Sequence, residues 1–303
     1  MPLPSAVSRI SLHIPLLNKK MPELPEVEVI CQGLLPHLMH RTIIDVRCSG
    51  KQLRTPVDCE ELQRELNEKQ IVNLTRRAKY LVLKTDNGAT LVIHLGMTGN
   101  MGIFDAESAT KKHDHVCWLL DNNTELRFND TRRFGAVRLF TANNAAKEEK
   151  KFFSAIGPEP FSRACSVAYL MQRAAHRKQA IKSFIMDSHV VAGIGNIYAN
   201  ETLFHSRIHP ERPASSLSSK EWKRLLTIMR KTLKHAIKCG GSTINDFVNA
   251  SGEGGYFQMN FRIYGKAGEA CSCCGLVISK KTIGGRASFF CEKCQPKLEG
   301  SSR

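Results

Sequence analysis

The 303-residue chain has no uninterrupted apolar run of about 18 residues, the length that a helix needs to cross a bilayer. We therefore expect no membrane-spanning segment. It also shows no internal repeat of about 20 to 50 residues and no low-complexity tract. Acidic residues are scarce, with 28 Asp and Glu against 44 Lys and Arg. The net charge of +16 favours a polyanionic partner, with nucleic acid the first choice and an anionic membrane surface the second.

The cysteines do not form the pattern of a disulfide framework. Of the 11 cysteines, four form two Cys-x-x-Cys pairs near the C-terminus, so we expect reduced thiols and one metal site. The pairs Cys271/Cys274 and Cys291/Cys294 have the spacing of a zinc ribbon, in which four thiolates hold one tetrahedral ion. Cys273 is expected to be a bystander. The alternative is a disulfide or a redox dithiol, but no thioredoxin-like strand–helix–strand context surrounds the pairs. About forty residues at this end build little core, so the metal is expected to supply their fold.

The first 20 residues differ from the remainder because they contain basic residues but no acid. Prolines at positions 2, 4 and 15 interrupt them, and the basic pair Lys19 and Lys20 comes last. A secretory signal instead places its basic residues before an unbroken apolar centre. An organellar transit peptide fits slightly better. We favour a third explanation, in which translation starts at Met21 and residues 1–21 are an extension.

The stretch from Met21 to Glu28 reads Met-Pro-Glu-Leu-Pro-Glu-Val-Glu. Prolines and acids suit the first turn of any helix, because that turn has unpaired N–H groups and a positive dipole end. A second interpretation is that Met21 is removed, which leaves Pro22 with a free secondary amine. Such an amine is a nucleophile that forms an iminium with a sugar aldehyde carbon.

Hydrophobic periodicity predicts one helix over residues 25–36 and strands after it. Turn signals at Asp86-Asn87-Gly88 and at Asn122-Asn123 indicate two hairpins. The strand-like segments are residues 42–48, 80–85, 89–95, 115–121, 125–129 and 136–140. These features predict an antiparallel β-sandwich with one helix over residues 22–152. The charged stretch 145–151 leads to Ile156-Gly157-Pro158-Glu159-Pro160, which we interpret as an interdomain linker.

Beyond the linker the pattern becomes helical. Residues 169–175 and 180–187 are expected to form helices, and Ser218 with Glu221 forms a capping box before a longer helix that ends at Gly240-Gly241. The apolar stripe of that helix, with Trp222 and Met229, is interpreted as core. The length allows two domains and a small module. We expect a helical domain over residues 153–262 and a finger over residues 263–303.

Several loops combine glycine, apolar and basic residues. Met97 lies between glycines, and Phe134 follows two arginines, a combination that proteins use to unstack a duplex. By residue type, both are more often core. The Gly193-x-Gly195 pair indicates either a phosphate approach or only a tight turn. Arg286 lies on a hairpin-like loop and is either a solvated turn residue or a phosphate ligand.

Motifs at residues 22–28, 76–80, 94–99, 113–115, 132–135 and 195–199, followed by the four-cysteine ribbon, resemble those of the bacterial formamidopyrimidine-DNA glycosylases in the same order. The resemblance runs from Met21 to about Gln295. It implies an α+β fold, with an N-terminal antiparallel β-sandwich carrying one helix and a C-terminal helix–two-turn–helix domain with a zinc-ribbon finger. It also implies a monomeric, cytoplasmic bacterial enzyme of base excision repair. Such an enzyme is a bifunctional DNA glycosylase and AP lyase for oxidised purines, acting on double-stranded DNA with oxidised bases or abasic sites.

The resemblance also implies roles for single residues. Pro22 is the nucleophile that attacks C1′ of the damaged nucleoside, and Glu23 is the proton donor in base release. Lys79 assists β-elimination and Arg286 assists δ-elimination, both with phosphate contacts. The ribbon cysteines are the ligands of a structural zinc ion. The positions expected to contact DNA are His113, Arg132, Arg177, Asn196, Lys182, Met97 and Phe134. Three of these, Met97, Arg132 and Phe134, fill the space of the flipped base, and Arg132 faces the orphan cytosine.

The chain departs from the family pattern in three places. Thr131 replaces the proline of an Asp-Pro-Arg turn, which is expected to loosen the turn, and residues 176–179 keep only part of a lysine-rich run. Joined to Met21, Pro22 is a tertiary amide without a nucleophilic lone pair. One alternative is an endonuclease VIII-type glycosylase for oxidised pyrimidines, which Leu24 disfavours because that branch has glycine there. The other is a damage-binding protein without catalysis, if Pro22 stays blocked.

Overall fold

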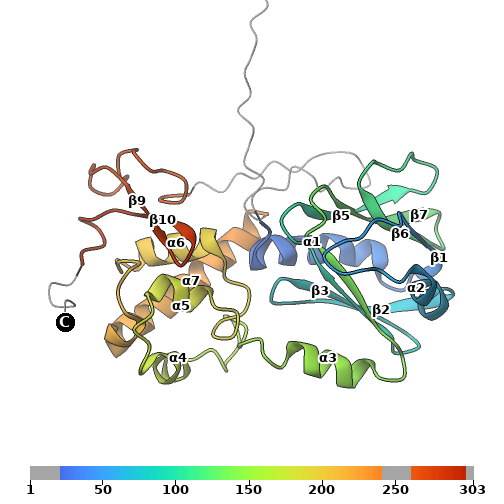
Figure 1. Cartoon of the computed structure of the whole chain (residues 1–303), viewed down its shortest axis with the longest axis horizontal. Coiled ribbons are helices and arrows are strands. Elements are labelled where there is room, and N and C mark those ends of the chain that lie inside the picture. Colours follow the sequence, from blue (N-terminus) through green and yellow to red (C-terminus); the bar gives the residue numbers. More distant parts are fainter. Residues whose placement is uncertain (1–20, 241–260, 298–303) are drawn as a thin grey trace, which may run out of the picture.

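The computed structural model describes residues 21–240 and 261–297, and two lobes lie side by side in it (Figure 1). The N-terminal lobe is rich in strands, and the C-terminal lobe is helical and carries a small two-stranded finger. The extension 1–20 and the predicted helix end at Gly241 lie outside the described residues. No helix within the described ranges is long and apolar enough to cross a membrane.

Helix α1, Leu24–Leu38, opens the described chain and confirms the predicted first helix. Pro25 lies in its first turn, where no N–H partner is needed, and the Glu26 carboxylate accepts the Glu23 N–H at 2.9 Å. One face of the helix packs into the core of the N-terminal lobe, through residues that include Val27, Ile30 and Leu34. This burial fixes the position of the first turn, which carries Pro22 and Glu23.

Eight strands form the N-terminal sheet in the order β5-β7-β6-β1-β2-β3-β4-β8, with every pair antiparallel. The two halves of this order meet only at β1 and β2, which pair at two positions, Thr42↔Gln70 and Ile43↔Lys69. Side chains from both halves enter one core, so the predicted sandwich is confirmed. The strands are β1 Thr42–Cys48, β2 Lys69–Arg77, β3 Tyr80–Thr85, β4 Thr90–His94, β5 Gly99–Asp105, β6 Asp114–Leu120, β7 Thr124–Asp130 and β8 Ala136–Phe140.

Two short helices correct the expectation of a single helix in this lobe. Helix α2, Cys59–Leu66, begins where the Asp58 carboxylate accepts the Glu61 N–H, and it buries only Leu62 and Leu66. Helix α3, Ala145–Phe153, occupies the charged stretch that leads to the linker. Both helices are short and mostly polar, so hydrophobic periodicity gives little signal for them.

A disulfide joins Cys48, at the end of β1, to Cys59, at the start of α2. The expectation of reduced thiols is wrong for this pair. The fold brings the two Cα atoms to 6.0 Å, a proximity that their spacing in the sequence does not reveal. The other cysteines of the described residues are free thiols, including the four of the ribbon.

The C-terminal lobe packs four helices around a second core. The longest, α7, begins at the predicted capping box, where Ser218 and Glu221 exchange hydrogen bonds, and it buries Trp222 and Met229 as expected. The elements of this lobe are α4 Val167–Ala174, α5 Ile181–Met186, α6 Asn196–His205, the 3-10 turn η1 Ala214–Ser216 and α7 Ser219–Lys238.

Helix α6 holds the finger, which consists of β9 Ser279–Ile283, β10 Arg286–Phe290 and the cysteine knuckles. The buried Glu201 carboxylate accepts the N–H groups of residues 262–264 at 2.9 to 3.0 Å. Asn200 accepts the Phe289 N–H at 2.8 Å, and Gln295 donates to the Ile208 carbonyl at 2.9 Å. The start of α6 also donates hydrogen bonds to the Glu23 carboxylate, at the start of α1. One helix therefore connects the finger to the first turn of α1.

Candidate active site and metal centre

Glu23 lies where the N-termini of α1 and α6 meet. Its carboxylate accepts the N–H groups of Gly195 and Ile197, both at 2.8 Å, although it precedes them by more than half of the chain. The Leu24 N–H also donates to the Gly193 carbonyl at 3.1 Å. A Cβ atom on Gly195 would overlap the Glu23 carboxyl group, and Gly193 has a φ of +81°. The two glycines therefore serve a protein carboxylate, which occupies the N-terminus of α6 where a phosphate was one expectation.

The environment of Glu23 raises its pKa from 4.5 to about 7. Burial is the largest cause, and the neighbouring Glu26 also raises it, while Lys79 and the backbone N–H groups lower it. A carboxyl group with this pKa is populated in both forms near neutral pH. It is therefore suited to give and take a proton in one reaction cycle.

Glu26 and Tyr198 fix the position of the first turn of α1. The Tyr198 hydroxyl donates to the buried Glu26 carboxylate at 2.6 Å, and the other carboxylate oxygen accepts the Glu23 N–H. The turn is thereby tied to α6 by side chains as well as by backbone. Pro22, one residue earlier, is half-buried at the same junction.

Lys79 enters the junction from the turn between β2 and β3, and its ammonium donates to the Ile194 carbonyl at 3.2 Å. Burial lowers the Lys79 pKa, and the charge of Arg286 lowers it further, while Glu23 and Glu26 raise it. Arg286 itself is exposed at the start of β10. Glu23 and Lys79 thus approach each other from the start of α1 and from the sheet, and the charge of Arg286 on the finger reaches Lys79, while the catalytic roles of the three residues stay predictions.

Lys182 is one of the predicted DNA contacts. It is fully buried on α5, and its ammonium donates to the Ala287 carbonyl at 2.8 Å and to the Ser288 hydroxyl at 2.6 Å. Burial lowers its pKa to about 8. The residue therefore supports the strand that carries Arg286, and a direct DNA contact stays a prediction.

The remaining predicted contacts lie on separate elements. Asn196 is the first residue of α6 and forms a side-chain hydrogen bond with Tyr264. Arg177 is exposed after α4, and His113 is half-buried just before β6. These positions leave their assignment as DNA contacts a prediction.

Two loops of the N-terminal lobe are tied to each other by Asp130, the last residue of β7. Its carboxylate accepts the Thr98 hydroxyl at 2.5 Å, the Arg132 N–H at 3.2 Å and the Gly135 N–H at 2.7 Å. A Cβ atom on Gly96 would overlap the backbone of residues 134 and 135, so the loops touch backbone to backbone. Asp130 thereby closes the turn with threonine at position 131.

Phe134 is 46% exposed, so the core interpretation is wrong for it. The Arg132 guanidinium lies 4.7 Å from the centre of its ring, so a cation and an exposed aromatic project from one turn. Met97, on the adjoining loop, is half-buried. Exposing an apolar ring to water is unfavourable, so the exposed Phe134 ring is consistent with insertion into a base stack.

The four ribbon cysteines form one cluster. Their sulfur atoms all lie within 4.8 Å of one another, with Cys271 3.8 Å from Cys294 and Cys274 3.4 Å from Cys291. Four thiol sulfurs around one point, with none of them in a disulfide, fit a tetrahedral metal ion. Cys273 is exposed and lies outside the cluster, as expected. The cluster closes a small core of its own that packs on α6.

Sequence reasoning missed the residues that position these groups. Tyr198, Asp130 and Glu159 carry no local signal of their function, because each acts on a segment far away in the sequence. Glu26 stood in the opening octet, but its acid alone is ordinary for a helix start.

The fold and site define a two-lobed protein in which a carboxyl group with a pKa of about 7, a half-buried lysine and a four-cysteine finger meet at the junction of the lobes. Residues 21–137 match the model of the formamidopyrimidine-DNA glycosylase N-terminal domain, and residues 156–248 match that of its H2TH domain. The formamidopyrimidine-DNA glycosylase of Vibrio vulnificus (strain CMCP6) is 45% identical over 275 residues, covering 91% of this chain and 100% of its own. That of Shewanella oneidensis is 43% identical over 277 residues, with the same coverage.

Solved structures agree. A Lactococcus lactis FPG mutant in complex with Fapy-dG-containing DNA superposes with a TM-score of 0.82 at 32% identity, covering 91% of this chain and all of that one, 100%. A Lactococcus lactis Fpg complex with abasic-site DNA gives a TM-score of 0.81 at 32% identity over the same 91% of this chain. The chain belongs to the formamidopyrimidine-DNA glycosylase family of DNA-repair enzymes.

Proposed function

We propose that this chain is a bifunctional DNA glycosylase and AP lyase that removes oxidised purines, 8-oxoguanine opposite C and formamidopyrimidines among them, from double-stranded DNA. The observation that carries the proposal is that Lys79 approaches Glu23, which has a pKa of about 7 and directly follows Pro22 in the chain. The Lactococcus lactis relatives, whose complexes contain Fapy-dG DNA and abasic-site DNA, support the choice of substrate.

The chemistry begins at Pro22 once the chain starts there. The lone pair of its secondary amine attacks C1′, and the bond from C1′ to the base breaks. Glu23 supplies the proton that the departing base requires. The amine then loses its proton and the bond from C1′ to O4′ breaks, with O4′ taking the electron pair and a proton from Glu23, which gives an iminium between Pro22 and C1′. This cation accepts the electrons left when C2′ loses a proton, so the 3′ phosphate departs by β-elimination with Lys79 nearby. A second elimination, with Arg286 beside the 5′ phosphate, completes strand cleavage.

Binding uses separate groups for phosphate and for the gap in the stack. Lys79, Arg177 and Arg286 neutralise phosphates, with further contacts from His113, Asn196 and the region of Lys182, so affinity falls steeply with salt. Phe134 and Met97 fill the space of the extruded nucleotide, and Arg132 pairs with the orphan cytosine. Extrusion costs a few kcal/mol, which these contacts offset.

The metal is assigned as one structural zinc ion held by Cys271, Cys274, Cys291 and Cys294. Four sulfur ligands with tetrahedral spacing favour zinc, and its role is to stabilise the finger that presents Arg286. Elemental analysis of the purified chain is expected to find zinc in a one-to-one ratio.

We place the lobe boundaries at residues 22–152 and 153–262, with the finger from residue 263.

Borohydride trapping tests the lyase mechanism. A chain that begins at Pro22, mixed with a duplex containing 8-oxoguanine opposite C, is expected to give a covalent adduct that survives denaturation. A chain that keeps Met21 has a blocked amine and is the matched control. No adduct from the correctly processed chain would exclude the mechanism and leave a damage-binding protein. The intact mass of protein from the native host shows whether Pro22 is free there.

Substrate choice is tested separately by excision kinetics. One Lactococcus lactis structure contains DNA with an oxidised pyrimidine, which favours testing this second class. We expect faster single-turnover release of 8-oxoguanine opposite C than of an oxidised pyrimidine. The reverse order would replace oxidised purines by oxidised pyrimidines as the principal substrate.

A further inference from the structure

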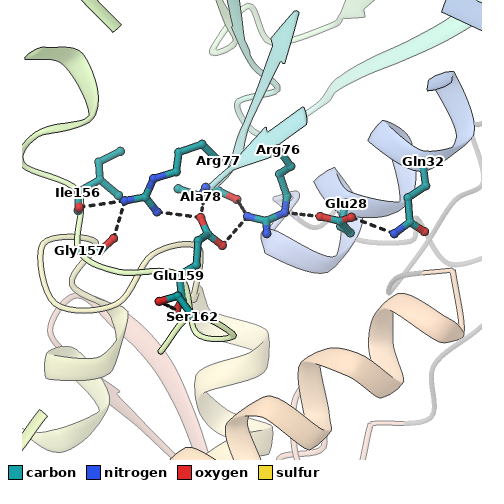
Figure 2. Close-up of polar contacts among 9 residues, drawn as sticks. All are labelled: Glu28, Gln32, Arg76, Arg77, Ala78, Ile156, Gly157, Glu159 and Ser162. Atoms are coloured by element: carbon teal, nitrogen blue, oxygen red, sulfur yellow. Dashed lines mark hydrogen bonds and ion pairs between the residues drawn. The ribbon is translucent and has the colours of Figure 1, made fainter. Parts of the chain in front are cut away.

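Glu159 lies in the segment that joins the two lobes, and its carboxylate is surrounded by donors from the sheet (Figure 2). It accepts Arg76 Nη1 at 2.8 Å, Arg77 Nη1 at 2.8 Å and the backbone N–H of Ala78 at 2.7 Å. All three donors belong to the end of β2 and the turn that follows it. The next residue is Lys79. One carboxylate therefore holds the turn that carries the half-buried Lys79.

The turn itself is conformationally unfavourable without help. Arg77 and Tyr80 pair across it, so Ala78 and Lys79 are its only central residues. Ala78 has a φ of 54°, a left-handed value that disfavours any residue with a Cβ atom and that hairpin turns usually reserve for glycine or asparagine. The Glu159 carboxylate accepts the N–H of this same residue. The hydrogen bond thus stabilises the backbone conformation that aims Lys79 into the junction.

The contacts of Glu159 continue in both directions (Figure 2). Arg76 also donates to Glu28 of α1, at 2.6 Å, and Arg77 donates to the carbonyls of Ile156 and Gly157, at 3.1 and 2.7 Å. Ion pairs and hydrogen bonds therefore connect helix α1, the turn that carries Lys79 and the interdomain segment.

The charges in this set alternate in sign, which makes its burial tolerable. Arg76 is only 8% exposed and lies between Glu28 and Glu159, so neither cation nor anion is left without a partner. Burial by itself would raise the Glu159 pKa, but the Arg76 charge and the hydrogen bonds from Ala78 and both arginines outweigh burial and lower it. Glu159 is thus a permanent anion with a fixed geometry.

We propose that Glu159 is a positioning residue for Lys79, which fixes the turn between β2 and β3 against the interdomain segment and so holds the Lys79 ammonium beside Glu23. The inference rests on the proposed function in assigning Lys79 a part in strand cleavage. The geometry of the turn, however, is independent of that assignment. Glu159 itself touches no reacting atom.

Glu159→Gln is the decisive variant, because glutamine keeps the shape but cannot accept from three donors or balance two arginines. Single-turnover cleavage of a duplex with a preformed abasic site is expected to slow about 10- to 100-fold, the usual effect of misplacing a reacting group by about 1 Å. The DNA dissociation constant is expected to change much less. Glu149→Gln is the matched control, since it removes an ion pair with Lys84 at 2.6 Å between β3 and α3, away from the junction.

A second readout needs no activity. The pKa of Lys79 is measured by NMR titration of lysines labelled at the ε-carbon, with Lys79→Arg to assign the signal. Burial lowers this pKa, so a Lys79 that leaves its position in Glu159→Gln has a pKa closer to the ordinary value. Loss of the Glu159 charge alone would lower the pKa, so a rise reports position rather than charge.

An unchanged Lys79 pKa together with an unchanged cleavage rate in folded Glu159→Gln overturns the proposal. If that variant does not fold, Glu159→Asp keeps the charge with a shorter reach and is expected to show intermediate changes in both readouts. Failure of the proposed function is a different result. In that case the wild-type chain does not cleave abasic DNA, while the titration still reports whether Glu159 positions Lys79.

Discussion

Glu23 and Glu159 are two carboxylates at the junction of the lobes, and both accept backbone N–H groups, yet their pKa values move in opposite directions. Burial, helped by Glu26, raises the pKa of Glu23 to about 7 against the opposing charge of a single lysine, Lys79. Two guanidinium groups around Glu159 outweigh its burial and lower its pKa. The partners therefore decide whether a buried carboxyl exchanges protons or remains a fixed anion. We assign chemistry to the first and positioning to the second.

Neutralising Glu23 is the strongest test of the contrast between proton exchange at Glu23 and positioning by Glu159. Glu23→Gln still accepts a backbone N–H but has no proton to transfer, so excision of 8-oxoguanine is expected to fall by about 10²- to 10⁴-fold in single-turnover assays. DNA binding is expected to change little. Excision at the wild-type rate by Glu23→Gln would remove the carboxyl from the mechanism and make both residues structural.

The pH dependence of the free energy of unfolding is expected to have opposite signs for Glu23 and Glu159. Because Glu23 has its pKa raised from 4.5 to about 7 on folding, wild-type stability is expected to decline as pH rises through that window. At about 1.36 kcal/mol per pKa unit, the ionised form costs about 3 kcal/mol above pH 7. Glu23→Gln should therefore be more stable than wild type at pH 8, as measured by denaturant unfolding.

Glu159 is expected to act in the opposite sense. Its lowered pKa means that its ionised form stabilises the fold above about pH 4.5, and that this contribution is lost as the pH falls further. Glu159→Gln should destabilise the protein at pH 8 by about 1–3 kcal/mol, because hydrogen bonds to charged donors are lost. If both variants shifted stability in the same direction, the contrast between the two carboxyl groups would be wrong.

The charge of Glu26 provides a finer test, since it helps to raise the Glu23 pKa. In Glu26→Gln the pKa of Glu23 is expected to fall. Excision that needs protonated Glu23 then declines at lower pH than in wild type, and a displacement of one unit from a pKa of about 7 would reduce the rate at neutral pH about fivefold. The pH–rate profile of kcat/KM measures this directly. Tyr198→Phe, which removes a hydrogen bond to Glu26 but no charge, is the control and is expected to move the profile less.

The sequence was sufficient for several elements that depend on neighbours along the chain and have a strong local pattern. The first helix, the capping box at Ser218 and the ribbon cysteines follow from periodicity, end signals and spacing, and all are confirmed. The resemblance to a known family, rather than local pattern, brought Glu23 and Lys79 into one site. Their pKa values depend on burial and on partners from the other lobe, which no local pattern encodes.

The failures have the same origin. Residue type alone favoured the core for Phe134, whereas the resemblance favoured a DNA contact, and in the turn held by Asp130 the side chain is exposed. Burial of Lys182, which its residue type does not suggest, is possible because two acceptors in the finger satisfy its ammonium. The Cys48–Cys59 disulfide depends on α2, which has too few buried residues to predict. In each case a contact between distant segments overrode the residue type.

Asp130 extends the comparison to a third carboxylate, which resembles Glu159 in holding a loop by several donors. The Thr98 hydroxyl donates to Asp130 and accepts the Arg132 N–H at 3.0 Å, so it connects the loop of Met97 to that of Arg132. Thr98→Val keeps the shape and removes this connection, which is worth about 1 kcal/mol for one hydrogen bond. We expect the preference for C over A opposite 8-oxoguanine to fall about fivefold, with little change in abasic-site cleavage. Thr98→Ser restores the hydroxyl and should restore the preference; an equal loss in Thr98→Ser would show that packing, and not the hydroxyl, aims Arg132.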